Sequence, residues 1–431
     1  MNLTPEQMDQ GRRNFLKALT GTPALAALGV AAGVRGPIPG GRVRLGFIGV
    51  GSQGRAQLGN VDPKYGDVRA LCDINPAQLK LADAVLEKNA MPPARHYADW
   101  QEMFEKEDIE AVIMAPPLWA HADLAVGCLE AGKHVLCEKM MAWDVDGCER
   151  MRAAAARNGR VLEIGYQRNY NPMYQAAYDG IIKAGTIGDI YHARLAWHRN
   201  GSWRRKGEPP APDYDASKWG YPTFDHLYNW RLYWKYSQGL MAELCSHQVN
   251  AANWYLGAAP EAVIASGGLY RFPDKREVYD HVYATFEYPG GRTAVFSSIE
   301  SNAFDDYYEM YFGTKGTLIL LREREALLFE EGSGGRQTGL EVTPAVAGGP
   351  VAQSSETMVA NTNQARTGRA APSSSGDASV RPPATRFQMQ RFCSAIRVGT
   401  PLACGPEKAF GSARACIAAN EAIKTKARVR I

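Results

Sequence analysis

The sequence predicts an α/β protein, with a doubly wound parallel sheet first and then an α+β domain with an open, mainly antiparallel sheet. A glycine-rich turn follows an apolar stretch at residues 43–49. Strands and helices then alternate up to residue 164, as in a parallel sheet covered on both faces. From His192 onward, successive strands of alternating polarity favour an antiparallel sheet with helices on one face. The 431 residues suit two or three domains.

Composition narrows the class of protein. Lys and Arg total 49 against 45 Asp and Glu, and no long basic block occurs, which argues against a nucleic-acid surface. The eight cysteines form no CxxC pair and no Cys/His spacing of a zinc site, so we predict no metal centre. We expect most of them to be reduced residues of the core.

The N-terminus carries an export pattern. Arg12 and Arg13 precede an apolar run from Ala18 to Ala32 that has no acidic residue, which predicts a twin-arginine signal peptide. Such a signal places the protein in the periplasm or outside the cell. The run is too short and too rich in Ala and Gly for a stable membrane span. The alternative interpretation is an amphipathic N-terminal helix.

Residues 43–49 read as a buried strand that leads into a G-x-G-x-x-G turn and a helix. The first glycine permits the tight turn, the second lets the backbone approach a pyrophosphate, and the third lets helix and strand pack closely. The following helix offers free N–H groups to phosphate. The pattern predicts a dinucleotide site on a Rossmann sheet, with contacts from Gly49, Gly51, Ser52, Gln53 and Gly54.

An acidic residue supports the dinucleotide prediction. Residues 68–73 read as a second strand that ends at Asp73, 19 residues after Gly54. A carboxylate there binds the adenosine ribose hydroxyls and repels a 2′-phosphate. We therefore predict NAD rather than NADP as the cofactor.

The alternation continues regularly after Asp73. Helices are predicted at 79–88, 121–131 and 145–157, and strands at 111–115, 134–137 and 161–164.

At this point the chain resembles the Gfo/Idh/MocA oxidoreductase family. The resemblance rests on "GFIGVGSQG", "HVLCEKM", "GYQRNYNP" and "GLMAELCSHQVNAANWYLG", with "YFGTKGTLIL" as a fifth stretch. It covers most of the chain after the export pattern, and the order of the motifs is more specific than any one of them.

The resemblance implies catalytic and cofactor-binding residues. Glu138 and Lys139 match the family's Glu-Lys-Pro motif, although Met140 replaces the proline. The lysine of such enzymes lies near the nicotinamide, where a cation can stabilise negative charge on the substrate oxygen. In "GYQRNYNP", Gln167 and Arg168 are predicted to face the nicotinamide or the substrate. An interdomain ion pair is the alternative for Arg168.

A second motif implies a base. Glu243 and His247 match the family's Asp-x-Gly-x-His, with Glu for Asp, Cys245 for Gly, and Asn250 where an Asp often stands. On a helix after Gly239, positions i and i+4 share a face. We therefore expect the Glu243 carboxylate to orient and charge-stabilise the imidazole, which then accepts the hydroxyl proton. The alternative is a histidine of the core.

An aromatic group points to the substrate. Aromatic faces with polar tips suit a sugar, whose C–H face stacks on rings and whose hydroxyls need directed partners. Packing in the sheet or at a subunit interface is the alternative for any one of them. The group consists of Trp197, Trp203, Trp219, Tyr221, Trp230, Tyr233, Trp234 and Tyr236, interleaved with His198, Arg199, Arg204, Asp225, His226, Asn229 and Arg231.

Three parts follow from these patterns. They are a signal peptide and linker at 1–41, an NAD-binding Rossmann domain at 42–164, and a substrate and oligomerisation domain at 165–431. Residues 331–385 are rich in Gly, Ser, Ala, Thr and Pro, and are predicted to be a flexible insertion without a catalytic role. Two closing helices are predicted at 386–399 and 404–426. The open sheet favours a homodimer or homotetramer.

Export and a nicotinamide cofactor together favour a cofactor that stays bound, because no NAD pool is expected outside the cytoplasm. The resemblance implies hydride transfer on a sugar or sugar derivative most directly. A redox-neutral NAD-dependent glycoside hydrolase is the alternative, with the same Lys139 and His247. A non-catalytic nucleotide- or sugar-binding protein is a third possibility.

Overall fold

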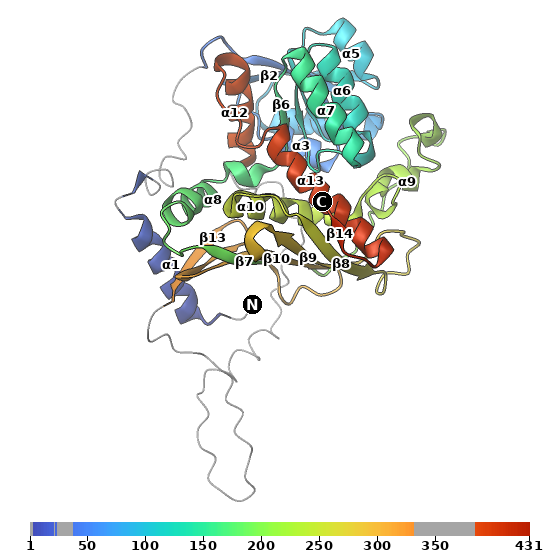
Figure 1. The fold of residues 1–431 in the computed structure, drawn as a ribbon. Helices are drawn as coiled ribbons and strands as arrows, with labels where there is room; N and C mark the ends of the chain where they lie inside the picture. Colours follow the sequence, from blue (N-terminus) through green and yellow to red (C-terminus); the bar gives the residue numbers. More distant parts are fainter. Residues whose placement is uncertain (1–2, 21, 24–37, 332–383) are drawn as a thin grey trace, which may run out of the picture.

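The computed structural model describes residues 3–20, 22–23, 38–331 and 384–431. Two sheets organise the chain, one in each of two stacked domains (Figure 1). Most of the apolar run from Ala18 to Ala32 and nearly all of the predicted insertion lie outside the described residues.

The first sheet has six strands in the order β3-β2-β1-β4-β5-β6, and every neighbouring pair is parallel. This order, which reverses direction beside β1, confirms the predicted doubly wound sheet. The strands are β1 (Val43–Ile48), β2 (Gly66–Cys72), β3 (Arg95–Tyr97), β4 (Ala111–Met114), β5 (His134–Cys137) and β6 (Leu162–Ile164).

Helices connect these strands. Asn75, Asp99 and Asp144 each accept a backbone N–H at the start of a helix, as N-cap residues do. The helices are α3 (Ser52–Leu58), α4 (Pro76–Lys88), α5 (Trp100–Lys106), the 3₁₀ turn η1 (Leu118–Ala120), α6 (His121–Glu130) and α7 (Val145–Asn158). The sequence pattern did not predict β3 or α5.

The second sheet has eight strands in the order β13-β12-β11-β7-β10-β9-β8-β14. Every pair is antiparallel except β7 with β10, so the predicted mainly antiparallel sheet is confirmed. Its strands are β7 (Ile190–His198), β8 (Ala262–Gly268), β9 (His281–Tyr288), β10 (Arg292–Ile299), β11 (Tyr307–Gly313), β12 (Gly316–Leu321), β13 (Glu325–Glu330) and β14 (Val429–Arg430).

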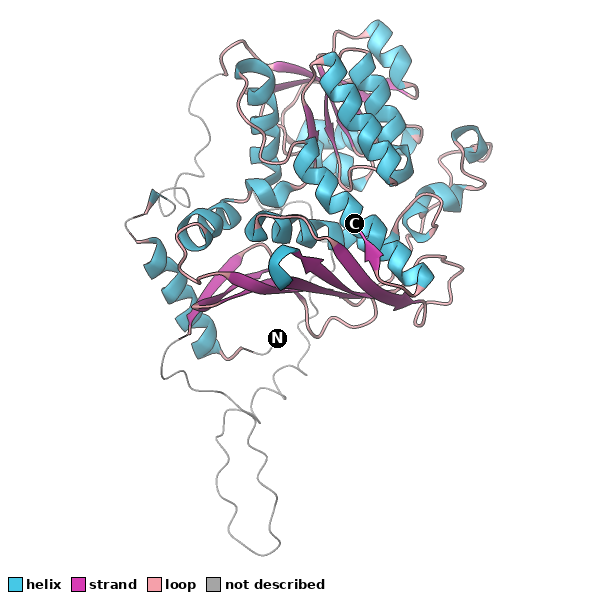
Figure 2. Cartoon of the chain, in the orientation of Figure 1, coloured by secondary structure: helices cyan, strands magenta, loops and turns pink. Residues whose placement is uncertain are grey.

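The long helices of the second domain lie between its sheet and the first domain (Figure 2). They are α8 (Pro172–Ala177), α10 (Ser246–Leu256) and α13 (Pro406–Thr425). Apart from α1 at the β13 edge, no helix of the described part of the chain covers the opposite face of the sheet in Figure 2, which agrees with the predicted open sheet. Shorter elements are η2 (Gln167–Tyr170), η3 (Tyr178–Ile182), η4 (Ala216–Trp219), α9 (Phe224–Tyr228), η5 (Trp230–Leu232), η6 (Met241–Cys245) and η7 (Pro289–Gly291).

The helix α12 (Ala384–Val398) completes the first domain although it comes late in the chain. Its Met389, Phe392 and Cys393 join the buried cluster that contains Val43 and Leu45 of β1. The second range predicted above, 165–431, therefore includes a helix that packs in the core of the first domain. All eight cysteines are buried and unpaired.

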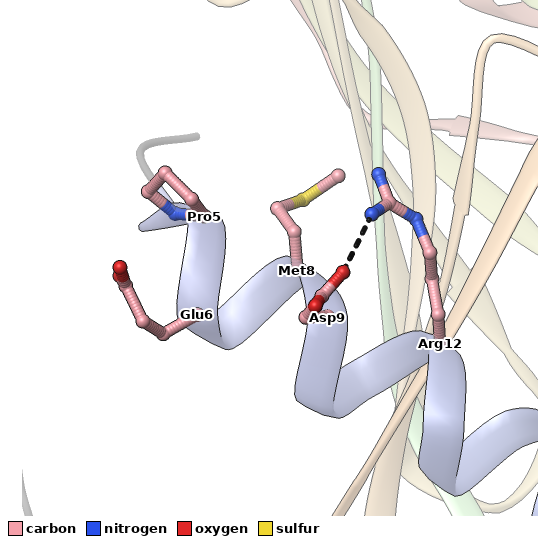
Figure 3. A pocket seen from close by; sticks show the side chains of 5 residues that line it. All are labelled: Pro5, Glu6, Met8, Asp9 and Arg12. Carbon is pink, nitrogen blue, oxygen red and sulfur yellow. Dashed lines mark hydrogen bonds and ion pairs between the residues drawn. The ribbon is translucent and has the colours of Figure 1, made fainter.

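The N-terminal helix α1 (Pro5–Leu19) packs on β13 at one edge of the large sheet. Thr4 and Gln7 form a capping box that fixes its start. Gly11 fits closely, because a Cβ there would lie 2.8 Å from the Cβ of Leu327. Arg12 pairs with Asp9, as Figure 3 shows beside a hollow lined by residues of this helix, and also with Glu325 of β13. The two arginines of the export pattern thus also belong to a packed helix.

No helix among the described residues combines the length and the apolar character needed to cross a bilayer.

Candidate functional site

The glycine turn has the geometry that a dinucleotide needs. Gly49 has φ +80°, and a Cβ there would lie 2.8 Å from the backbone N of Pro116. A Cβ at Gly54 would lie 2.0 Å from the carbonyl oxygen of Gly49, so only glycine allows α3 to pack this closely. A Cβ at Gly51 meets no atom within 4 Å. Open space therefore lies above Gly51, where the pyrophosphate would approach, and the three predicted roles agree with the structure.

Asp73 lies beside this turn at the end of β2. Its Oδ2 accepts the N–H of Val50 at 2.8 Å, and its Oδ1 accepts the N–H of Asn75 at 2.8 Å. Burial raises the pKa of Asp73 to about 6, against the lowering effect of these two N–H donors and of Arg55. The carboxylate is held where the ribose hydroxyls of NAD would bind. The turn and Asp73 together fit the predicted dinucleotide.

Gln53 and Glu138 connect the turn to the end of β5. The Nε2 atoms of Gln53 and Gln57 donate to Glu138 Oε1 at 2.5 and 2.8 Å. Glu138 Oε2 accepts the backbone N–H of Lys139 at 3.1 Å. Glu138 therefore positions the backbone that leads to Lys139. Ser52 lies in the same turn, and its Oγ accepts a hydrogen bond from Arg205 at 3.3 Å.

Lys139 is held by the second domain. Its Nζ donates to the carbonyl oxygen of Glu243 at 2.9 Å and lies 3.8 Å from the Glu243 carboxylate. Arg231 Nε donates to the same carboxylate at 2.8 Å. Although burial opposes it, Arg231 and then Lys139 lower the pKa of Glu243 to about 2. Glu243 is thus a fixed anion between two cations. The peptide bond from Lys139 to Met140 is cis.

His247 lies on α10 near this group. It is 7% exposed, and its Nδ1 is buried with no hydrogen-bond partner among the described residues. Burial lowers its pKa well below the ordinary value, and the charges of Lys139 and Arg168 lower it further. The imidazole is therefore neutral near pH 7 and can accept a proton. Lys139 bonds to the backbone of Glu243, in the turn that leads directly into α10, so the two predicted catalytic residues belong to the same part of the molecule.

The predicted support of His247 by Glu243 is wrong. The turn Met241–Cys245 is a π-helix, and regular α-helix begins only at Ser246. A π turn contains more residues than an α turn, so positions i and i+4 do not line up as on an α-helix. The Glu243 carboxylate faces Arg231 and Lys139 instead. Its role is to hold the lysine.

The predicted cofactor contact of Arg168 is also wrong. Its side chain is 1% exposed, its Nε donates to Glu323 at 2.8 Å, and its Nη1 pairs with Glu309. Both acids belong to the large sheet and its β12–β13 turn, so Arg168 forms a buried ion pair within the second domain. Gln167, half-buried at the start of the neighbouring turn, forms no hydrogen bond with the glycine turn or Lys139 in the described part of the chain. Asn250 accepts from the Asn169 amide at 2.6 Å.

The aromatic group is divided between two places. Trp197 lies 5.9 Å from the ring of His247 and stacks on Tyr307. Tyr221 and Tyr236 instead pack on Trp119 of the first domain. Trp203 and Trp230 lie under the guanidinium groups of Arg199 and Arg231, at 4.0 and 4.4 Å. Only part of the group is therefore available to stack on a sugar near His247.

Two residues to which the sequence pattern does not point, Trp119 and Arg205, also lie at the boundary between the domains. Trp119 Nε1 donates to the hydroxyl of Tyr221 at 2.7 Å, and Arg205 reaches the glycine turn through Ser52. An isolated tryptophan after a strand carries no signal of its own. Arg205 stands beside Arg204 in a loop without periodicity.

The arrangement combines a nucleotide turn with a cation and a neutral imidazole. Such a set can hold a hydroxyl-bearing carbon, stabilise charge on its oxygen and remove the hydroxyl proton.

Comparison with known proteins agrees with this geometry. Residues 43–166 match a model described as the NAD-binding Rossmann fold of the Gfo/Idh/MocA oxidoreductase family. Residues 176–319 match the C-terminal domain of the same family. The two models together match more than half of the chain.

Individual relatives are more distant. Inositol 2-dehydrogenase of Salmonella typhimurium is 33% identical over 189 residues, which are 43% of this chain and 52% of that protein. The match thus spans about half the length of that relative. A glycosyl hydrolase family 109 protein of Shewanella baltica is 28% identical over 179 residues, 38% of this chain and 39% of that protein.

A solved structure has the same fold along most of the chain. The WlbA dehydrogenase of Chromobacterium violaceum, in complex with NADH and UDP-GlcNAcA, has a TM-score of 0.66 at 20% identity and covers 92% of this chain and 98% of its own. The fold, the glycine turn and both domain models lead to one conclusion: the chain belongs to the Gfo/Idh/MocA family of oxidoreductases, with an NAD-binding Rossmann domain.

Proposed function

We propose that the protein is an NAD-dependent oxidoreductase that acts on a CH–OH group of a sugar or sugar derivative and retains its cofactor. The observation that carries the proposal is that Lys139 of the first domain bonds to the Glu243 backbone of the second, in the turn that leads into the helix with the buried His247. The family, and the inositol dehydrogenase and UDP-sugar-bound dehydrogenase among its relatives, support a polyhydroxylated substrate.

Each residue has a defined task in this proposal. NAD bound at the glycine turn would supply the acceptor for the hydride of the carbon. Lys139 donates to the substrate oxygen and stabilises the negative charge that develops there. His247 takes the hydroxyl proton, which its lowered pKa permits near pH 7. Glu243 keeps Lys139 in place. The sugar itself rests on Trp197, whose ring lies beside His247.

The test is replacement of His247 by Ala in the purified protein. Sugar oxidation should fall by roughly 100-fold or more, the usual contribution of a positioned base, while bound NAD remains. His96→Ala is the matched control, because His96 is a surface residue that pairs with Asp83. An active His247→Ala variant would contradict the role of this residue. Mass analysis of the nucleotide released on denaturation should give NAD, and NADP would contradict the role of Asp73.

A redox-neutral glycoside hydrolase is the second candidate, favoured by the Shewanella relative. In this reaction a sugar hydroxyl is oxidised, the acidified neighbouring C–H loses its proton, and the aglycone leaves as its anion. Water then adds, and the hydride returns to carbon, so no net oxidation occurs. Release of aglycone from aryl glycosides without added NAD would favour this candidate. Tight NAD and sugar binding without turnover on any sugar would favour a binding protein instead.

We further propose export by the twin-arginine route to the periplasm or cell exterior. Support comes from Arg12 and Arg13 in front of the apolar run. This route carries folded proteins, which suits an enzyme that loads NAD before export. We also propose a homodimer or homotetramer, because most of one face of the large sheet carries no helix of the described chain. Light scattering of the purified protein measures that state.

A further inference from the structure

The segment from Arg199 to Tyr236 leaves the end of β7 and reaches the first domain. In Figure 1 its helix α9 stands away from the large sheet, beside the Rossmann domain. The end of the segment is tied to that domain by hydrogen bonds from Trp143 Nε1 to the Trp234 carbonyl at 3.1 Å and from the Trp119 N–H to the Tyr236 carbonyl at 3.3 Å. Three further hydrogen bonds tie its earlier part. They run from Arg205 Nη2 to Ser52 Oγ at 3.3 Å, from the Tyr214 hydroxyl to the Ile74 carbonyl at 3.0 Å, and from Trp119 Nε1 to the Tyr221 hydroxyl at 2.7 Å.

The three attachment points share one edge of the parallel sheet. Ser52 follows β1, Ile74 follows β2 and Trp119 follows β4, and these strands are neighbours in the order β2-β1-β4. The carboxyl ends of such strands, where the strand order reverses, are the place where this fold binds a dinucleotide. The segment therefore lies along the same edge as the cofactor.

The backbone of Arg205 is fixed at this edge. Its N–H donates to Asn229 Oδ1 at 2.6 Å, and its carbonyl accepts from Asn229 Nδ2 at 3.1 Å. Asn229 is 4% exposed and also donates to Asp225 at 2.8 Å. The loop thus presents the Arg205 side chain from a rigid base.

The guanidinium of Arg205 has no carboxylate partner in the described part of the chain, whereas the adjacent Arg204 pairs with Asp225 and Asp274. Arg205 is exposed, and its side chain donates a hydrogen bond to Ser52, inside the G-x-G-x-x-G turn. A planar guanidinium binds phosphate oxygens with two parallel N–H groups. Ser52 directly follows Gly51, where a Cβ would meet no atom within 4 Å, so the guanidinium reaches the part of the turn that has room for an anion.

We propose that Arg205 binds the pyrophosphate of the dinucleotide, and that the segment from Arg199 to Tyr236 encloses the cofactor and slows its release. This inference rests on the proposed function, because it takes the cofactor to be NAD. It gives a physical basis for retention: the nucleotide leaves only when the ties to Ser52, Ile74 and Trp119 open.

The test is the rate at which bound NADH dissociates from Arg205→Ala, followed by nucleotide fluorescence. We expect release to be roughly 10- to 100-fold faster than from the wild type, because one charge-assisted hydrogen bond to the nucleotide is lost. Arg205→Lys should recover part of the loss, and Lys206→Ala, the exposed neighbour, should release at the wild-type rate. ADP-ribose, which contains the pyrophosphate, should bind Arg205→Ala correspondingly more weakly, whereas adenosine should bind it unchanged.

Wild-type release from Arg205→Ala would overturn the proposal. So would a raised KM for an acidic sugar with unchanged NADH release, because Arg205 would then bind substrate. Enclosure is checked separately with Tyr214→Phe and Trp119→Phe, each of which removes one tie without touching the phosphate. Faster release from both supports enclosure, and wild-type release from both overturns it. A wild-type protein that retains NAD but oxidises no sugar would refute the proposed function alone.

Discussion

Single residues decide how the charge at the reacting centre is arranged. Glu243 lies between Lys139 and Arg231, and its pKa of about 2 keeps it ionised. Glu243→Gln would leave two cations facing each other without their anion. We expect turnover to fall by roughly 10- to 100-fold, as for the loss of a buried charged partner. Steady-state rates measure this.

Glu243→Asp is the companion variant, since it keeps the charge on a shorter side chain. It should retain more activity than Glu243→Gln, and both variants should still contain NAD. Equal activities of Asp and Gln at this position would contradict a positioning role of the charge. Loss of NAD from Glu243→Gln would instead place the carboxylate in cofactor binding.

His247 leads to a prediction about pH. Burial, followed by the charges of Lys139 and Arg168, holds its folded-state pKa well below 6.5. The imidazole therefore stays neutral when an ordinary histidine would be charged, and kcat/KM should stay flat as the pH falls through 6.5. An acid limb centred near pH 6.5 would contradict this.

The same shift affects stability. In the unfolded chain His247 binds a proton below about pH 6.5, but in the folded protein it does so only at much lower pH. Its contribution to stability is therefore complete above pH 6.5 and declines as the pH falls toward the folded pKa. Chemical denaturation between pH 7.5 and 5 should show a smaller loss of stability for His247→Gln than for the wild type.

At the scale of elements, the glycine turn contains one glycine that leaves room for a ligand, Gly51, and one that allows close packing, Gly54. Gly51→Ala should fold normally, because its φ of −58° suits alanine and its Cβ meets no atom within 4 Å. It should lose NAD, since the methyl group would occupy the approach to the pyrophosphate. Thermal unfolding and the nucleotide content of the purified variant measure the two effects.

Gly54→Ala is the contrasting variant in the same turn. Its Cβ would lie 2.0 Å from the Gly49 carbonyl, so α3 must shift, and we expect a loss of roughly 1–3 kcal/mol in unfolding free energy. A Gly51→Ala protein that keeps its NAD would contradict the assignment of this turn to the cofactor.

Elements with a strong periodic pattern were predictable, and short ones were not. The predicted strand at 134–137 matches β5, and the helix at 145–157 differs from α7 by one residue. The strand β3 has three residues, and two of them, Arg95 and His96, are exposed, so it carries no apolar signal. The helix α5 has seven residues, two turns of helix, which are too few to show a period.

The residues of the site were predictable where their role depends on a local sequence motif. They were not predictable where their role depends on a partner that is distant in the sequence. The glycine turn is a local pattern, and its three glycines behave as the spacing predicts. Arg168 meets Glu309, 141 residues further along the chain, and no local pattern reports that pairing. The π turn at Met241–Cys245 changed the direction of Glu243 relative to His247, and its presence depends on tertiary packing.

At the scale of the whole molecule, helices from both ends of the chain pack on elements that are distant from them in the sequence. The late helix α12 buries Phe392 against the first sheet, and Arg397 pairs with Glu110 beside β4. The helix α13 contacts α7 of the first domain as well as α10 and β8 of the second. The two domains are therefore joined by more than the chain at Gln167–Tyr170, and these contacts support the bond from Lys139 of the first domain to the Glu243 backbone of the second.

The N-terminal helix gives a prediction that separates export from packing. Arg12→Lys with Arg13→Lys preserves the positive charges, so the pair of Arg12 with Glu325 can be kept by the lysine. The exposed pairs around Asp9 contribute little to the fold, and the melting temperature of the purified variant should equal that of the wild type. A twin-arginine receptor reads the guanidinium pair itself, so the variant should accumulate in the cytoplasm while the wild type appears in the periplasmic fraction. Phe15→Ala, which removes a buried side chain of the same helix, should lower the melting temperature and keep the arginines. Equal distribution of the wild type and the double lysine variant between the fractions would show that α1 serves the fold and not export.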